Sequence, residues 1–300
     1  MRYLLLLLLT LASASAQDTF VPFFQSGSGN NLRSSLIAYY AFEEAAGVDA
    51  LDSSGNAPPK PLSVSAVAPI LNPYQVLAPS GRVGNAKGYS GGQAGTTDET
   101  DYYKRTDTDF AFTGEFTIAG WVYGDWRTGL LQCPHYTVAS RGPFGGTTFS
   151  WLISFDQQSA SSLTMTFIWS KNGTATFSTT TGDVFTAGWN FFYVKRSGTA
   201  ISIAVTPAGL TALAAPTTID NGVAGNTDGA LFNGNVEMQI GNLGGGYSCN
   251  DFAGVIDELG FWSRGLSICE LKWLYAEGGT ALNGGRPTFD TLPCATPVLP

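Results

Sequence analysis

The chain has 300 residues, of which 44% are apolar and 13% aromatic, and its formal net charge is −8. This apolar content excludes a disordered chain, and the lack of any Lys/Arg cluster argues against binding to nucleic acid, whose phosphates require clustered cations. The length suits one large all-β domain or two small ones, and 37 glycines and 15 prolines supply many turns.

The first 16 residues have the pattern of a secretory signal peptide. Arg2 gives a positive start, Tyr3–Leu11 is apolar, and Ala14-Ser15-Ala16 is a small-residue cleavage site. A membrane-spanning helix needs about 20 apolar residues, more than this run contains. We therefore expect cleavage before Gln17, a secreted extracellular protein and no membrane insertion of the mature chain.

Short β-type segments follow a polar N-terminal arm over residues 17–34. They are rich in β-branched and aromatic residues and are bounded by Gly, Asn, Asp or Ser. They predict strands within residues 35–44, 115–124, 136–142, 147–156, 163–170, 174–181, 189–196, 200–207, 236–242 and 252–263. Ser197-Gly198 is expected to turn a hairpin, and residues 96–109 and 124–135 are expected to be long loops.

One late segment has the pattern of a helix. Ser267 is a candidate N-cap, and Glu270, three residues later, completes a capping box. Gly278-Gly279 would end the helix. Helical spacing places four apolar residues on one face: Ile268, Leu271, Leu274 and Tyr275. Many short strands and one helix predict an all-β sandwich of two antiparallel sheets with a short C-terminal helix, followed by an extended, Pro-rich surface tail over residues 285–300.

The four cysteines suggest two disulfides, because an even number is typical of secreted proteins. Cys249 and Cys269 flank one long strand, so they are expected at its opposite ends and too far apart to pair. The favoured pairs are therefore Cys133–Cys249 and Cys269–Cys294. The sequence contains no close Cys-x-x-Cys pair, the spacing that a zinc site would need, so zinc binding is not expected. Asn172 begins an N-glycosylation sequon.

Five segments stand in a fixed order along residues 36–284: LIAYYAFEEAAG…ALDSSGN, GRVGNAKGY, EFTIAGWVY, GWNFFYVKRSGTAISIAV and FAGVIDELGFWSRGLSICELKWLYAEGG. In this order they resemble the laminin-G-like jelly-roll domains of the concanavalin A-like lectin/glucanase superfamily. The resemblance implies one domain over residues 35–284, built as a jelly-roll sandwich of two curved sheets. It also implies ligands that are mostly carbohydrates, with calcium often bound at the domain edge.

Asp257-Glu258 lies inside the last predicted strand and raises the question of catalysis. Adjacent strand residues point to opposite faces, whereas the glucanases of this superfamily carry paired carboxylates on one face. The only histidine, His135, is expected in a loop, where a surface role outweighs a catalytic one. We therefore expect no catalytic residues and no enzyme.

A calcium site is the stronger chemical hypothesis, because calcium takes six to eight oxygen ligands. Asp52 and Asn56 lie in the turn LDSSGN, and the resemblance implies that Asp257 comes close to it. The alternative is structural: an Asx-turn at Asp52 and an Asp257 that caps backbone groups. The sequence leaves both interpretations open.

Sugar recognition needs aromatic faces and polar partners at a concave site. Tryptophans inside strand patterns are expected in the core: Trp121, Trp151, Trp189 and Trp262. Loop residues are the better ligand-binding candidates: Trp126, Arg127, Tyr136, Tyr247, Asn250 and Asp251. We therefore expect a non-catalytic recognition module for a glycan, with calcium support. The alternatives are a protein-binding adhesion or structural module, which would expose an apolar patch, and a divergent glycoside hydrolase.

Overall fold

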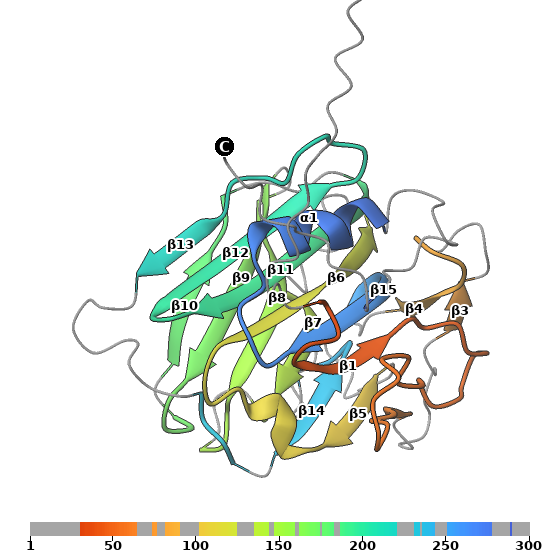
Figure 1. Cartoon of the computed structure of the whole chain (residues 1–300), viewed down its shortest axis with the longest axis horizontal. Helices are drawn as coiled ribbons and strands as arrows, with labels where there is room; N and C mark the ends of the chain where they lie inside the picture. The colour runs from red at the N-terminus through yellow and green to blue at the C-terminus, as the bar shows by residue number, and fades with distance from the viewer. Residues whose placement is uncertain are drawn as a thin grey trace, which may run out of the picture. The chain divides into compact units, whose positions relative to one another are not determined.

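Two antiparallel sheets lie face to face in this computed structural model (Figure 1). The structure describes residues 31–64, 74–76, 82–90, 102–124, 135–143, 147–159, 162–174, 176–182, 187–220, 231–234, 236–243, 251–277 and 289. All of them belong to one unit, Asn30–Pro293. The predicted all-β fold, a two-sheet antiparallel sandwich with one short C-terminal helix, is confirmed.

The first sheet has eight strands. Their order is β13 (Thr217–Asp220), β12 (Ala200–Pro207), β11 (Gly188–Ser197), β6 (Phe116–Gly124), β15 (Ala253–Trp262), β4 (Ala86–Ser90) and β3 (Tyr74–Val76), and β1 (Leu36–Tyr40) also pairs with β15. The longest strands, β6, β11 and β15, are central to this sheet.

The second sheet has seven strands. Their order is β10 (Thr176–Thr180), β9 (Ser162–Ser170), β8 (Trp151–Ser159), β7 (His135–Arg141), β14 (Glu237–Ile240), β5 (Tyr103–Thr106) and β2 (Ser63–Val64). A short 3-10 helix, η1 (Thr108–Ala111), follows β5. The expected loop 96–109 therefore contains a strand, because Tyr103–Thr106 pairs with β14 and with β2.

Aromatic side chains from both sheets fill the space between them. Phe155 and Phe192 meet edge to face with ring centroids 6.2 Å apart, and Phe116 lies 5.8 Å from Phe167. Each of these rings is fully buried, so each contributes about 1.5–3 kcal/mol of hydrophobic stabilisation. The prediction of core tryptophans is confirmed for those at 121, 151 and 262, whereas Trp189 is only half-buried.

A second, smaller core lies on the outer side of the eight-stranded sheet, beneath α1 (Ile268–Glu277). Leu271 and Leu274 of α1 are buried there, while Ile268 is 47% exposed, so the predicted apolar face is narrower than expected. Leu32 and Phe289 are also buried in this core. Both lie outside the expected domain bounds of 35–284. Phe289 is the one residue of the predicted tail that the structure describes, so the course of the tail over 285–300 stays a prediction.

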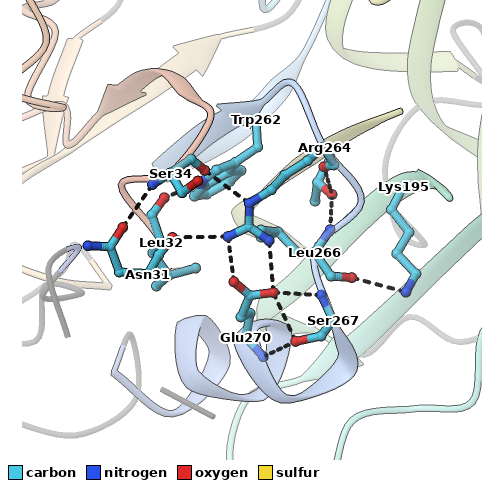
Figure 2. Close-up of polar contacts among 10 residues, drawn as sticks. Asn31, Leu32, Ser34, Lys195, Trp262, Arg264, Leu266, Ser267 and Glu270 are labelled. Atoms are coloured by element: carbon cyan, nitrogen blue, oxygen red, sulfur yellow. Dashed lines mark hydrogen bonds and ion pairs between the residues drawn. The ribbon is translucent and has the colours of Figure 1, made fainter. Parts of the chain in front are cut away.

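The start of α1 is fixed by a capping box and by one arginine (Figure 2). The backbone N–H of Glu270 donates to Ser267 Oγ at 3.2 Å, and the Ser267 N–H donates to the Glu270 carboxylate at 2.8 Å, as predicted. Arg264 donates to the same carboxylate and to the carbonyls of Ser34 and Asn31. The guanidinium therefore ties the N-terminal turn to the helix.

Two further findings complete the fold. The β11–β12 hairpin turns at residues 198–199, because Ser197 pairs with Ala200, one residue later than the predicted turn at Ser197-Gly198. Gly198 has φ 58°, a conformation that favours glycine. Among the described residues, no helix has the length and apolar character needed to cross a membrane.

Candidate functional site

The outer side of the seven-stranded sheet carries polar side chains in cross-strand rows. His135, Asp156 and Thr164 form one row, because the register pairs each with the next. Cross-strand partners project to the same side of a sheet, while the alternate residues enter the core. Of these side chains His135 is exposed and the others are buried. We call this set the polar face, and define it by six residues: His135, Thr137, Ser154, Asp156, Thr164 and Thr166.

A carboxylate on the polar face is held by two neighbours. Oδ1 of Asp156 lies 2.9 Å from His135 Nδ1, and Ser154 Oγ donates to the same oxygen at 2.8 Å. The hydrogen bond to Asp156 raises the pKa of His135, although partial burial opposes this effect. His135 is the first residue of β7 and not a loop residue, which corrects the expectation from the sequence.

The order of these contacts does not match that of a serine nucleophile activated by histidine. Asp156 stands between Ser154 and His135, whereas activation of a serine nucleophile requires the histidine in the middle. The second carboxylate oxygen, Asp156 Oδ2, has no hydrogen-bond donor among the described residues. The polar face therefore offers an oriented, largely buried acceptor whose second oxygen is not hydrogen-bonded by the described residues. Thr164 is the cross-strand partner of Asp156, and farther along the sheet the hydroxyls of Thr166 and Thr180 lie 3.2 Å apart.

The predicted ligand-binding residues have different outcomes. Trp126, Arg127, Tyr247 and Asn250 lie outside the described residues. Tyr136 is a core residue of β7 with 5% exposure, so the expectation of a loop aromatic at this position is wrong. Asp251 is buried directly before β15.

The predicted covalent sites are only partly described. Cys269 is disulfide-bonded, but Cys133, Cys249 and Cys294 lie outside the described residues, so the pairing stays a prediction. Asn172 is exposed in the turn between β9 and β10. Its glycosylation also stays a prediction.

Asp52, a predicted calcium ligand, is used by the backbone around it. Its Oδ1 accepts from the N–H groups of Tyr39 and Ser54, and its Oδ2 accepts from Lys60 N at 2.9 Å. Asn56 Nδ2 donates to the Leu36 carbonyl. These bonds have the form of the structural alternative, a corner brace. Within the described part of the chain, no group of three or more His, Cys, Asp or Glu side chains could hold a metal ion.

Asp257 and Glu258 occupy a β-bulge, so they do not alternate. The register pairs Asp257 with Trp121 and Gly260 with Ala119, which leaves two residues of β15 opposite the single Gly120. Glu258 has φ 52°, and a bulge with such a residue reverses the alternation locally. Asp257 and Glu258 therefore both face the outer side of the sheet, and the expectation that they lie on opposite faces is wrong.

The two carboxylates are buried next to each other beneath α1. Asp257 is fully buried and accepts from Val83 N at 3.0 Å. Tyr39 Oη donates to the Glu258 carboxylate, which lines a cavity of about 10 Å³, the size of one water molecule. Burial, followed by the charge of Glu258, raises the pKa of Asp257 well above its usual range. This pair braces the fold, in line with the predicted structural alternative for Asp257.

Comparisons with known proteins identify a fold. No protein-family model matches the chain, and no curated protein matches it. A crystal structure of HCR/D-Sa-GBL1/C is similar with a TM-score of 0.50 and 12% identity, over 83% of this chain and 54% of that one. A botulinum neurotoxin DC binding domain in complex with SialylT has a TM-score of 0.49 at 12% identity, over 83% and 53%. The chain spans about half the length of these structures, and at 12% identity the first likeness shows a shared fold alone.

Proposed function

We propose that the protein is a non-catalytic recognition module that binds a carbohydrate on the polar face. The observation that carries the proposal is the carboxylate of Asp156. One of its oxygens is fixed by His135 and Ser154, and the other has no donor among the described residues. A fixed carboxylate accepts short, charge-assisted hydrogen bonds from sugar hydroxyls, and its orientation is set before the ligand arrives.

The position of the paired carboxylates favours binding over glycoside hydrolysis. A glycosidase places two carboxyl groups on either side of the scissile bond, within roughly 5–10 Å of each other. The pair Asp257 and Glu258 lies on the other sheet, 0% and 5% exposed beneath α1. Both groups lie beneath α1, which separates them from solvent, whereas the neighbour of Asp156 on the polar face, His135, is half-exposed. Asp156 itself is 6% exposed, so a sugar would reach its carboxylate from the His135 end of the row.

The proposal includes three expectations from the sequence. The first is secretion after removal of residues 1–16, and the second is membership of the laminin-G-like group. The third is calcium support through Asp52, Asn56 and Asp257. The hydrogen bonds of Asp52 to three backbone N–H groups support the corner brace, so calcium needs a test of its own.

The test is a glycan array probed with the mature chain from Gln17, in calcium and again in a chelator. Binding to one class of sugar supports the proposal. Loss of that binding in the chelator supports calcium ligation, and unchanged binding supports the brace. Failure of the folded protein to bind any glycan would reject carbohydrate recognition and favour a protein-binding adhesion or structural module.

A further inference from the structure

A pocket of about 350 Å³ lies on the outer side of the other sheet. Its walls are the loop 209–213 after β12, the exposed side of α1, and Arg82 from the segment before β4. Pockets for small ligands measure about 300–1,000 Å³, so this one has room for a compact molecule. It lies on the eight-stranded sheet and is therefore separate from the polar face.

Among the described residues that line this pocket there are two cations and no carboxylate: Arg82 and Lys272. The Arg82 guanidinium lies 4.2 Å from the centroid of the Trp121 ring. Trp121 in turn stacks on Tyr275 with centroids 5.5 Å apart and an interplanar angle of 18°. This stack holds the guanidinium plane in one place at the pocket wall, and a cation over an indole face is itself stabilised.

One nitrogen of the Arg82 guanidinium lacks a hydrogen-bond partner in the described part of the chain. Its Nε is buried and makes no hydrogen bond. The carboxylate of Asp257 is near enough to act on Arg82 by its charge, but it accepts its hydrogen bond from the backbone N–H of Val83. Burial lowers the pKa of Arg82, which is the effect of desolvating an arginine. A half-buried guanidinium with an unsatisfied nitrogen is costly unless an anion supplies the missing hydrogen bond.

The rest of the pocket is held in place and partly apolar. Tyr275 Oη lies 2.8 and 2.9 Å from the carbonyl oxygens of Pro207 and Leu210, which share its one hydrogen, so the loop is fastened to the helix. Leu210 is 51% exposed, and Leu213 also lines the pocket. A ligand that fits has an anionic group for the two cations and a nonpolar surface for the leucines.

We propose that this pocket binds a compact organic anion of monosaccharide size, whose oxyanion group pairs with Arg82 and Lys272. The planar guanidinium takes the oxyanion with two parallel hydrogen bonds, and the ammonium adds a point charge. A carboxylate and a sulfate share this chemistry. The pocket does not depend on the proposed glycan site, so either proposal stands if the other fails.

The experiment titrates the mature protein with D-glucuronate, glucose 6-sulfate, inorganic sulfate and neutral glucose, and follows tryptophan fluorescence and heat. We expect saturable binding of glucuronate or the sulfated sugar, weaker binding of inorganic sulfate, and none of glucose. Tighter binding of glucuronate than of glucose 6-sulfate would identify the oxyanion as a carboxylate, and the reverse would identify it as a sulfate. Binding should weaken as salt rises from 0.05 to roughly 0.5 M, because the Debye length shortens.

Three variants assign the binding to the pocket. Arg82→Gln removes a charge-assisted hydrogen-bond donor and should weaken binding by about 10- to 100-fold. Lys272 lies at an exposed position of α1, so we expect Lys272→Gln to leave the fold intact. This variant should weaken binding by about 2- to 5-fold. Lys104→Gln on the seven-stranded sheet is the matched control and should change nothing. Absence of anion binding by folded protein, or binding that Lys272→Gln leaves unchanged, would overturn the proposal.

Discussion

The buried carboxylate of Asp257 should make the stability of the protein fall as pH rises. Its pKa in the folded protein is raised, first by burial and then by the charge of Glu258, whereas an aspartate in an unfolded chain titrates near pH 3.9, as a rough reference. Between these two pKa values the folded protein holds a proton that the unfolded chain has lost. This contribution to stability is therefore complete below about pH 3.9 and is lost as pH rises through the folded-state pKa.

The size of the effect follows from one bound proton. Within that window the free energy of unfolding falls by about 1.4 kcal/mol per pH unit. Asp257→Asn removes the titrating group but keeps an acceptor for the N–H of Val83, which donates at 3.0 Å in the wild type. We therefore expect the variant to lose the slope that the Asp257 proton contributes.

The assay is urea denaturation of wild type and variant between pH 4.5 and about 8, with the free energy of unfolding extrapolated to water. Wild type should lose stability with pH more steeply than Asp257→Asn. The matched control is Asp109→Asn, whose side chain is 52% exposed and should leave the wild-type slope in place. Parallel curves for wild type and Asp257→Asn would refute the buried, proton-holding carboxylate.

Three further predictions concern the polar face, the helix start and one turn. His135→Gln should cost under about 1 kcal/mol near pH 5.5, since the side chain is half-exposed. Because Asp156 raises the pKa of His135, that cost is present below about pH 6.5 and should vanish by pH 9; an equal cost at both pH values in urea denaturation would contradict the ion pair. Glu270→Ala removes the capping box and the partner of Arg264, and should lower the free energy of unfolding by about 2–3 kcal/mol; a loss under roughly 0.5 kcal/mol would show that α1 needs neither. Gly173→Ala places a Cβ against a backbone carbonyl at φ 89° and should cost about 2 kcal/mol or more; an unchanged melting temperature would mean that this turn relaxes freely.

Local patterns in the sequence were enough for the long strands and the helix start. The strands β6, β11, β12 and β15 are runs of β-branched and aromatic residues between turn residues, and the capping box is a three-residue signal. The short strands could not be predicted in this way. β2 has two residues and β13 has four, too few for a periodic pattern, and they form because a neighbouring strand supplies their hydrogen bonds.

The bulge in β15 could not be predicted because neither its residue types nor the local sequence signals it. Glu258 adopts φ 52°, which is uncommon outside glycine, asparagine and aspartate, so its residue type gives no signal. The two-against-one pairing with Gly120 is a property of the register between β6 and β15, about 140 residues apart in the sequence. Sequence reasoning therefore assumed alternation and placed the two carboxylates on opposite faces.

The polar face was visible only in part. The alternation of Thr164 and Thr166 with Met165 and Phe167 indicates a strand with one polar side. The approach of His135 to Asp156 depends on the register between β7 and β8, which the sequence does not encode locally. Without that register, His135 looked like a loop residue without a partner.

The most direct test of carbohydrate binding on the polar face is a calorimetric titration of the tightest array ligand into wild type and Asp156→Asn. Loss of a charge-assisted hydrogen bond is worth about 1.5–3 kcal/mol, so the account predicts affinity about 10- to 100-fold weaker in the variant. Asp109→Asn, in η1 and not on the polar face, should bind as wild type does. Equal affinity of wild type and Asp156→Asn, with both folded, would contradict the assignment of the polar face as the binding site.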